Sequence, residues 1–281
     1  MKTIRLYATL SIILMMSSCE KFTSTESETA PVKTEDTNVS LCITQSEQVK
    51  KACKRIAYGL FNVEGKVKAI NQEAQDSDFG TLHLCLPTGS YRLVTIGHNG
   101  KDNCTISTPE KVTFASNKLT DTFYRYQTFE VTNNGNATES ITLQRAVALF
   151  RLHINDTIPT QAKHIKFYYT GGSSTLDATT GYGCVNSRQT EIQTLSPTQK
   201  DYEVYTFPHA DGKKLKMTIT VMDDGGNTLT TITLTDVNVV RNYITTYSGS
   251  LFKNAGIHEG DSTEIEFEFD NRWAGEYKYS F

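Results

Sequence analysis

The sequence contains little proline, few cysteines and no large excess of charge of either sign. Only 6 of its 281 residues are proline, and 28 basic residues stand against 31 acidic ones. No run of five or more basic residues occurs, so the chain lacks the electrostatic footprint of a nucleic-acid-binding protein. The densest basic stretch, KKACKR at positions 50–55, is typical of a solvated surface. We therefore expect no nucleic acid among its partners.

Motifs for catalysis and metal binding are also missing. The six histidines lie far apart, without an H-E-x-x-H motif or a pair at metal-ligand spacing. There is no G-x-S-x-G nucleophile elbow. The glycine-rich stretches at 171–174 and 181–183 flank predicted strands, so they lack the aligned amides of a phosphate-binding helix start. We predict a non-enzymatic protein with no catalytic residue, no metal site and no cofactor.

The longest apolar run, residues 6–16, is too short for a permanent membrane helix, which needs about 20 apolar residues. Lys2 and Arg5 precede this run, and two serines follow it directly before Cys19. This is the layout of a secretory signal. The small pair before a cysteine resembles a bacterial lipoprotein signal, in which the cysteine becomes the first mature residue and carries the lipid. We predict a signal peptide at 1–18 and lipidation of Cys19.

The segment that follows is rich in threonine, serine and glutamate. Between residues 20 and 38, only Phe22 and Val32 are large enough to contribute to a core. Such a stretch cannot offset the entropy lost on ordering. We predict a flexible stalk at residues 19–38.

Five further cysteines remain after Cys19, so at least one thiol stays unpaired. In an exported protein, Cys42 with Cys53 or Cys85 with Cys104 could form a disulfide. Buried free thiols are the alternative. The sequence leaves this choice open for Cys42, Cys53, Cys85, Cys104 and Cys184.

Alternating apolar and polar residues predict strands over much of the chain. The pattern at 81–95, interrupted by Pro-Thr-Gly, predicts a hairpin. A second hairpin is expected at 215–235, around a turn of Asp, Gly and Asn residues at 223–227. The stretches at 264–269 and 277–281 show the same alternation and predict two strands near the end.

Helical signals are few, and the segment 46–60 is the only candidate for a helix. Many short strands separated by turn residues favour β-sandwiches. A polar, turn-forming stretch at 132–136 lies between two strong strand patterns. We predict an all-β fold with an N-terminal sandwich domain at 39–138 and a C-terminal one at 139–281.

Several phrases of the sequence resemble the fimbrillins of Bacteroidetes, the lipoprotein subunits and anchors of type V pili. They are LCLPTGSYRLVTI, ITLQRAVALFRLHI, VNVVRNYITTYSGSLF and FEFDNRWAGEYKYSF. The run N-x-x-T-x-x-x-G-x-L-F at 242–252 is the strongest. The resemblance implies two transthyretin-like Greek-key β-sandwiches behind a lipidated N-terminus. It implies a fimbrial anchor or accessory subunit on the outer membrane, supporting adhesion.

The resemblance also implies partners, namely other fimbrial subunits joined by strand exchange. In this family a protease cuts after a basic residue, the N-terminal strand leaves, and an extended segment of a neighbour fills the groove. Arg55 is the expected cut position and Arg145 an alternative, although anchor members keep their N-terminal strand and their lipid. A host or glycan ligand at the surface stays open.

Two segments are candidates for the exchanged strand. One is the first strand, residues 39–44. The other is the last strand, where Tyr277, Tyr279 and Phe281 are apolar anchors at a period of two.

A second function stays open: a surface glycan-binding lipoprotein of a polysaccharide-uptake system. In that case, exposed aromatic side chains would stack on sugar rings, whereas core packing is the alternative role for them. The candidates are Tyr124 with Tyr126, Tyr168 with Tyr169, and Trp273.

Overall fold

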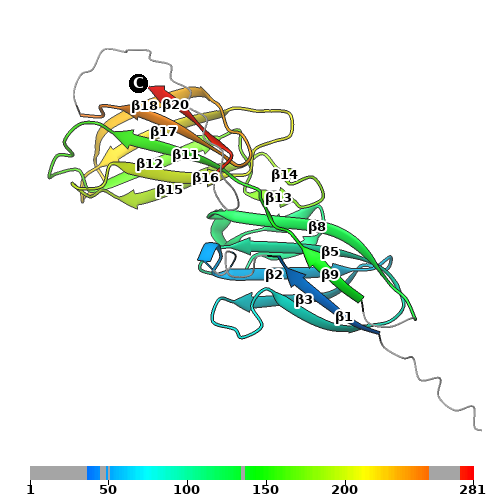
Figure 1. Ribbon diagram of the computed structural model, residues 1–281. Coiled ribbons are helices and arrows are strands. Elements are labelled where there is room, and N and C mark those ends of the chain that lie inside the picture. The colour runs from blue at the N-terminus through cyan, green and yellow to red at the C-terminus, as the bar shows by residue number, and fades with distance from the viewer. Residues whose placement is uncertain (1–36, 45–48, 50, 134–136, 253–272) are drawn as a thin grey trace, which may run out of the picture. The chain divides into compact units, whose positions relative to one another are not determined.

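The computed structural model describes residues 37–44, 49, 51–133, 137–252 and 273–281 (Figure 1). Its regular elements include strands β1 to β20 and one short 3-10 turn, η1 (Ala115–Asn117), and residues 49, 51 and 52 are helical. The prediction of an all-β fold is therefore confirmed. Within the described part of the chain, no helix is long and apolar enough to cross a membrane. The predicted signal peptide, Cys19, nearly all of the stalk and the predicted strand at 264–269 lie outside the described residues.

Two sheets enclose the core of the N-terminal half, with strand orders β4-β1-β9 and β10-β8-β5-β2-β3 (Figure 1). Buried and exposed residues alternate in β4 because one face meets the core and the other meets solvent. β2 and β5 are buried on both faces, because each face lines a different hydrophobic cluster. The bounds are β1 (Thr37–Ile43), β2 (Arg55–Phe61), β3 (Lys66–Glu73), β4 (Thr81–Leu86), β5 (Gly89–His98), β8 (Thr122–Val131), β9 (Ala137–Ile141) and β10 (Gln144–Arg145).

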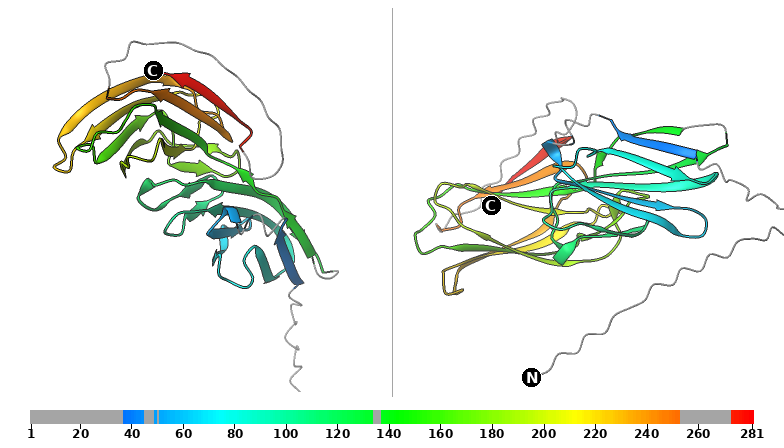
Figure 2. Two further views of the ribbon diagram at one scale, coloured as in Figure 1. Left: turned by 60° about the vertical axis from the view of Figure 1, so that its left-hand side comes forward. Right: turned by 90° about the horizontal axis from the view of Figure 1, so that it is seen from below.

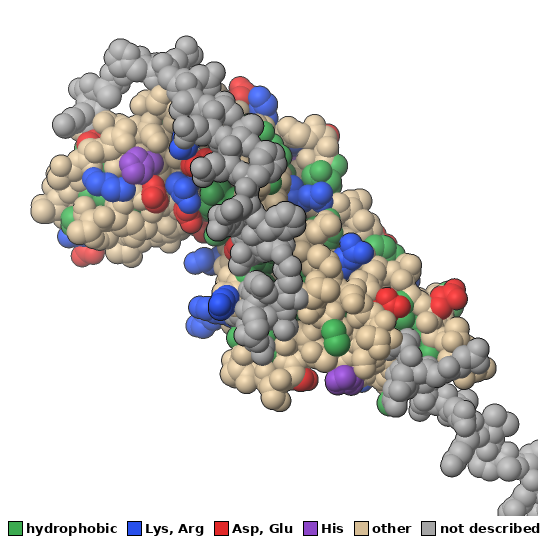
Figure 3. Space-filling view, viewed as in Figure 1, with side chains coloured by type: hydrophobic (Ala, Val, Ile, Leu, Met, Phe, Trp, Pro, Cys, Tyr) green, Lys and Arg blue, Asp and Glu red, His purple; other side chains and the backbone are tan. Residues whose placement is uncertain are grey.

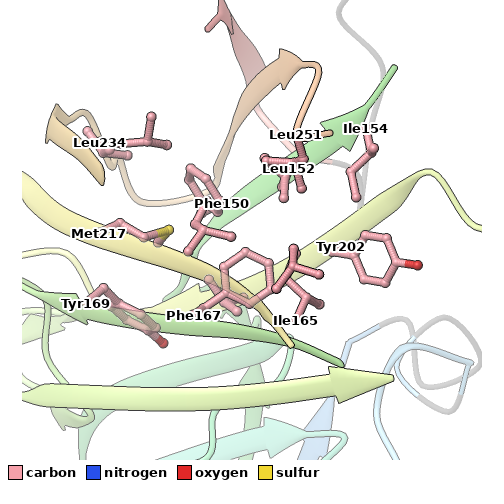
Figure 4. Packing of buried hydrophobic residues seen from close by; sticks show 14 of the residues in the cluster. Phe150, Leu152, Ile154, Ile165, Phe167, Tyr169, Tyr202, Met217, Leu234 and Leu251 are labelled. Atoms are coloured by element: carbon pink, nitrogen blue, oxygen red, sulfur yellow. The ribbon is translucent and has the colours of Figure 1, made fainter. Parts of the chain in front are cut away.

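The C-terminal half repeats the arrangement of two sheets around a core, with orders β16-β11-β19-β20 and β15-β12-β17-β18. Figure 4 shows this core, in which Phe150 of β11 and Phe167 of β12 meet edge to face at 6.2 Å between ring centroids. The bounds are β11 (Ala148–Ile154), β12 (His164–Thr170), β15 (Arg188–Thr194), β16 (Asp201–Thr206), β17 (Leu215–Met222), β18 (Thr228–Val237), β19 (Tyr243–Gly249) and β20 (Gly275–Ser280).

A small sheet of order β14-β13-β7-β6 contains strands from both halves. Val112 pairs with Leu176 across β7 and β13, and Phe114 lies 5.6 Å from Phe207 between ring centroids. These residues belong to a third hydrophobic cluster, which draws on both halves. The predicted domain boundary at residues 138 and 139 stays a prediction; it falls within β9. The bounds are β6 (Thr105–Thr108), β7 (Lys111–Thr113), β13 (Thr175–Asp177) and β14 (Tyr182–Gly183).

The surface carries charges of both signs. On the face in Figure 3, basic and acidic side chains are interspersed among uncharged ones. This mixture agrees with the small formal net charge of −3.

The helix predicted at 46–60 is wrong from residue 55 onward, because Arg55–Phe61 forms β2. Residues 49, 51 and 52, just before this strand, have helical backbone, and the Cys53 N–H donates to the Val49 carbonyl at 2.8 Å. A strand buried on both faces has a nearly continuous apolar sequence, which periodicity alone cannot distinguish from a buried helix.

The hairpin predicted at 81–95 is also wrong, although both strands exist. β4 pairs with β1, whereas β5 pairs with β2 and β8 in the other sheet. A period of two marks a strand with one buried face but does not identify its neighbour. The hairpin at 215–235 is confirmed as β17 and β18, and the Asn227 N–H donates to Asp223 Oδ1 in its turn at 2.8 Å.

Neither suggested disulfide forms. Cys53 and Cys104 are buried free thiols, and burial raises the pKa of each to about 12. Both cysteines serve as small apolar core residues.

Candidate functional site

The first strand, β1, lies at the centre of its sheet. It pairs antiparallel with β4 and parallel with β9, so both of its edges are hydrogen-bonded (Figure 2). Val39, Leu41 and Ile43 point into the N-terminal core and are at most 4% exposed. Strand β1 therefore fills a groove between β4 and β9 that would open if it left.

Among the strands that the structure describes, the last one, β20, lies at the edge of its sheet and pairs with β19 alone, in parallel (Figure 1). Its three predicted anchors face one side and are only partly buried. Tyr277 stacks on Tyr243 at 5.4 Å and Tyr279 stacks on Tyr247 at 4.8 Å between ring centroids. The last anchor, Phe281, packs against the C-terminal core.

A glycine of β19 makes room for this last anchor. A Cβ on Gly249 would lie 2.6 Å from the Phe281 ring, which is closer than carbon atoms approach. The Phe281 N–H also donates to the Ser248 carbonyl at 3.1 Å. Phe281 therefore has a fitted place beside β19.

The opposite face of β20 carries polar contacts. Glu276 accepts a hydrogen bond from the Thr246 hydroxyl and lies 3.6 Å from the Arg151 guanidinium. Arg151 also pairs with Glu203 of β16 at 2.7 Å. Because these groups are partly solvent-exposed, each pair contributes about 0–1 kcal/mol.

A buried arginine holds the start of β20. Arg145 makes a bidentate ion pair with Asp121 at 2.7 and 2.8 Å and donates to Asn242 Oδ1 at 3.0 Å. Its guanidinium carbon lies 4.1 Å from the Trp273 ring centroid and 4.7 Å from that of Phe123. We call Arg145, Asp121, Asn242, Phe123 and Trp273 the arginine clamp. It joins β10, β8 and the approach to β20.

Two further contacts secure the clamp. The Ala274 N–H donates to the Asn242 carbonyl at 2.7 Å, directly before β20 begins. Trp273 also stacks on Tyr205 at 6.3 Å between centroids. Burial, and secondarily the Asp121 carboxylate, raises the pKa of Tyr205 to about 12, so its hydroxyl stays neutral.

The predicted cut position, Arg55, is the first residue of β2. It pairs with Glu73 on one side and His98 on the other, and its guanidinium donates to Glu73 at 2.5 Å and to Asn103 at 2.9 Å. A protease needs an extended, unpaired chain, so it would have to open the sheet to reach this bond. Cleavage at Arg55 stays a prediction. The alternative position, Arg145, is 7% exposed and lies within the clamp.

The aromatic candidates do not form one joint exposed surface, because most of them are buried or packed. Tyr124 and Tyr169 are buried, and Trp273 packs in the arginine clamp. Tyr168 is exposed on the outer face of β12. The described residues contain no cluster of three or more His, Cys, Asp or Glu placed to hold a metal ion.

Sequence reasoning missed the arginine clamp, although its signal was present. Arg145 belongs to ITLQRAVALFRLHI, Asn242 to VNVVRNYITTYSGSLF, and Trp273 to FEFDNRWAGEYKYSF. Three of the four segments that resemble fimbrillins each contribute one residue to the clamp. Their meeting could not be inferred because they lie up to 128 positions apart, counted from Arg145 to Trp273.

An exposed edge strand can pair with an extended segment of another chain. The family model of fimbrillin-A associated anchor proteins Mfa1 and Mfa2 matches residues 34–277. The chain therefore belongs to this family of fimbrial anchor proteins.

The chain is also similar to solved structures. A proposed adhesin from Bacteroides ovatus is 9% identical, with a TM-score of 0.50 over 72% of this chain and 84% of that one. The fimbrial anchor protein Mfa2 from Porphyromonas gingivalis is 12% identical, with a TM-score of 0.41 over 70% of this chain and 82% of that one. No curated protein matches the chain.

Proposed function

We propose that the chain is an outer-membrane lipoprotein, anchored through Cys19, that serves as a fimbrial anchor or accessory subunit and supports adhesion. It joins neighbouring subunits by exchanging strands. The observation that carries this proposal is the unequal status of its terminal strands. β1 fills its own groove between two neighbours, whereas β20 is an edge strand with partly exposed anchors.

Strand exchange uses the same interactions that hold β20 now. Backbone hydrogen bonds to β19 supply affinity, and alternate side chains in pockets set the register. The Tyr243, Tyr247 and Gly249 positions of β19 receive the three anchors of β20. A neighbour's segment with aromatic residues at a period of two would fit these positions, and β20 would be free for donation in turn.

Keeping β1 in place is consistent with the role of an anchor subunit. Its three apolar side chains complete the N-terminal core, so the N-terminal half needs no strand from a neighbour. Assembly at one end only is what the first subunit at the membrane requires.

The test of strand exchange replaces the anchors while keeping the strand. In the full chain, Tyr277→Thr with Tyr279→Thr removes both stacked rings but retains residues suited to strands. We expect fibres from cells producing this variant to lose their attachment to the chain, as judged by co-purification. The control, Lys278→Thr with Ser280→Thr, changes the exposed positions of β20 and should co-purify normally. Normal co-purification of the double tyrosine variant would rule out exchange through β20.

The lipid anchor has a separate test. Cys19→Ala should move the chain from the membrane fraction to the soluble fraction, because the acylated residue is lost. Cys42→Ala is the matched control and should stay in the membrane fraction. Unchanged membrane association of Cys19→Ala would contradict the anchor.

A further inference from the structure

A polar cleft lies along the free edge of β15, away from the terminal strands. β15 is the edge strand of its sheet, and the cleft separates it from residues 116–118. The volume of the cleft is about 360 Å³. Sites for small ligands typically span about 300–1,000 Å³.

One wall of the cleft is a bend with unusual backbone. Ser116 and Asn117 have φ angles of 53° and 56°, in the left-handed region that non-glycine residues rarely adopt. Such conformations cost about 1–3 kcal/mol each and cluster at functional sites. Gln189 of β15 donates from its side-chain nitrogen to the Asn117 carbonyl at 3.5 Å, across the cleft. The bend is therefore tied to the opposite wall.

The side-chain oxygen of Gln189 has no hydrogen-bond donor among the described residues. Gln189 is only 4% exposed. Leaving such a buried acceptor unpaired costs about 1–3 kcal/mol, so native proteins rarely do so without a bound partner. This oxygen is an unpaired acceptor buried behind the wall of the cleft.

A second cavity of about 370 Å³ adjoins the first, and the two share Ser116 and Lys118. His98 lines it and is 1% exposed. Its Nδ1 accepts from the Gly100 N–H at 3.0 Å, which places the proton on Nε2. Nε2 has no acceptor among the described residues; the Phe114 ring, perpendicular at 5.5 Å, is at most a weak one. The wall of the second cavity thus holds a buried, unpaired donor.

The charged groups of the first cleft have both signs. Arg188 and Lys118 line it together with Glu191. Burial raises the pKa of Glu191, and the nearby Lys118 opposes this rise. A simple anion would be repelled by the carboxylate, and a simple cation by the two basic groups. Hydroxyl groups donate and accept, so a polyhydroxylated ligand can satisfy all three side chains.

An apolar surface adjoins the cleft. Ile192 of β15 is 57% exposed, and Tyr168, the cross-strand partner of Thr190, is 39% exposed. Directly opposed side chains lie about 5 Å apart, so the Tyr168 ring is next to the cleft wall. Sugars present an apolar ring face as well as hydroxyl groups, which suits an exposed aromatic ring beside polar groups.

We propose that this cleft binds a saccharide, with one sugar unit between β15 and residues 116–118 and a further unit reaching the cavity lined by His98. Arg188 and Glu191 contact the first unit. The site gives the protein a direct means of adhesion to glycans. It does not depend on strand exchange or on the lipid anchor.

The test uses the full chain in detergent on an array of neutral and acidic oligosaccharides, with saturation-transfer NMR on a panel of monosaccharides to detect weak binding. Arg188→Ala and Glu191→Gln should each weaken binding of the selected saccharide at least about tenfold, since each removes a charge-assisted hydrogen bond. Lys216→Ala, which removes an exposed charge from β17 outside the cleft, should bind normally.

Two results would overturn the proposal. One is that no saccharide binds in either measurement. The other is that a saccharide binds and neither cleft variant weakens it. Circular dichroism of each variant verifies folding, and Tyr277→Thr with Tyr279→Thr, which tests strand exchange, should bind the saccharide normally. The saccharide-binding proposal and the strand-exchange proposal can therefore fail independently of each other.

Discussion

The two terminal strands, β1 and β20, have the same alternation of apolar residues but are held differently. β1 is paired on both edges, and its inward side chains are at most 4% exposed. Among the described strands, β20 is paired on one edge, and its aromatic anchors are only partly buried. Alternation therefore shows that a segment is a strand, whereas the number of paired edges and the depth of burial determine how readily it leaves.

Magnitudes support this difference. Full burial of an aliphatic side chain contributes about 1.5–3 kcal/mol, and β1 buries three. The stacked tyrosine pairs of β20 each add about 0.5–1.5 kcal/mol beyond their partial burial. We expect β20 to open at a lower free energy than the global unfolding that releases β1.

The largest expected effect comes from placing a charge on each strand. Leu41→Asp buries a carboxylate in the N-terminal core and should prevent that half from folding. Tyr279→Asp leaves its carboxylate partly in water and should give a folded protein. Circular dichroism and limited proteolysis compare the two. Equal loss of folded structure in both variants would contradict the difference between β1 and β20.

A large effect is also expected at the arginine clamp. Arg145→Met leaves Asp121 without its bidentate partner, and breaking a buried pair in this way costs about 3–5 kcal/mol. Urea unfolding measures the loss, and hydrogen exchange at β20 should speed up more than exchange at β1. Arg151→Met, which breaks partly exposed pairs, is the control and should cost less. Unchanged exchange at β20 would show that the clamp does not hold it.

An intermediate loss of stability is expected at acidic pH. It arises in the N-terminal half, which contains β1. Burial, and secondarily the charge of Arg55, lowers the pKa of His98 from 6.5 to about 4. The unfolded chain therefore binds the proton more tightly, and stability falls as the pH drops from 6.5 towards 4. The loss is on the order of 2–3 kcal/mol.

Thermal unfolding at several pH values measures this acid effect. His98→Asn, which keeps an acceptor for the Gly100 N–H, should flatten the pH dependence, whereas His83→Asn should not. A wild-type profile that is flat between pH 4 and 6.5 would contradict the assignment.

The smallest effect is expected on the outer face of β20. Lys278 is 54% exposed at its side chain and lies 3.9 Å from Glu276. Lys278→Ala should change stability by less than about 0.5 kcal/mol, because exposed ion pairs contribute little. Tyr277→Ala should cost about 1 kcal/mol or more through lost stacking. Urea unfolding measures the stability loss of each variant. A larger loss for Lys278→Ala than for Tyr277→Ala would contradict the assignment of the aromatic face as the stabilising one.

Much of the fold could be predicted because strand signals are local. The alternation at 215–221 identified β17, and the turn at 223–227 identified its partner, β18. The segment 55–61 was wrongly predicted to be largely helical, because a strand buried on both faces does not alternate between apolar and polar residues. The hairpin at 81–95 was wrongly predicted, because the turn at 87–89 connects strands of two different sheets.

The candidate sites could be predicted only in part. The anchors at Tyr277, Tyr279 and Phe281 followed from a period of two within five residues. The arginine clamp and the saccharide cleft each combine residues from distant segments, such as Arg145 with Trp273 and Asn117 with Gln189. Nothing in the local sequence distinguishes these charged residues from others on the surface. Their importance follows from their burial and from their contacts with one another.

By itself, the sequence determined the all-β class, most strand positions and the resemblance to fimbrillins, because side-chain alternation and short phrases are local properties. Only the tertiary structure decided which strands are neighbours, that β1 is enclosed while β20 lies at an edge, and which polar groups stay unpaired. The physical reason is that backbone hydrogen bonds are the same for every residue, so the choice of partner depends on the packing of the whole core.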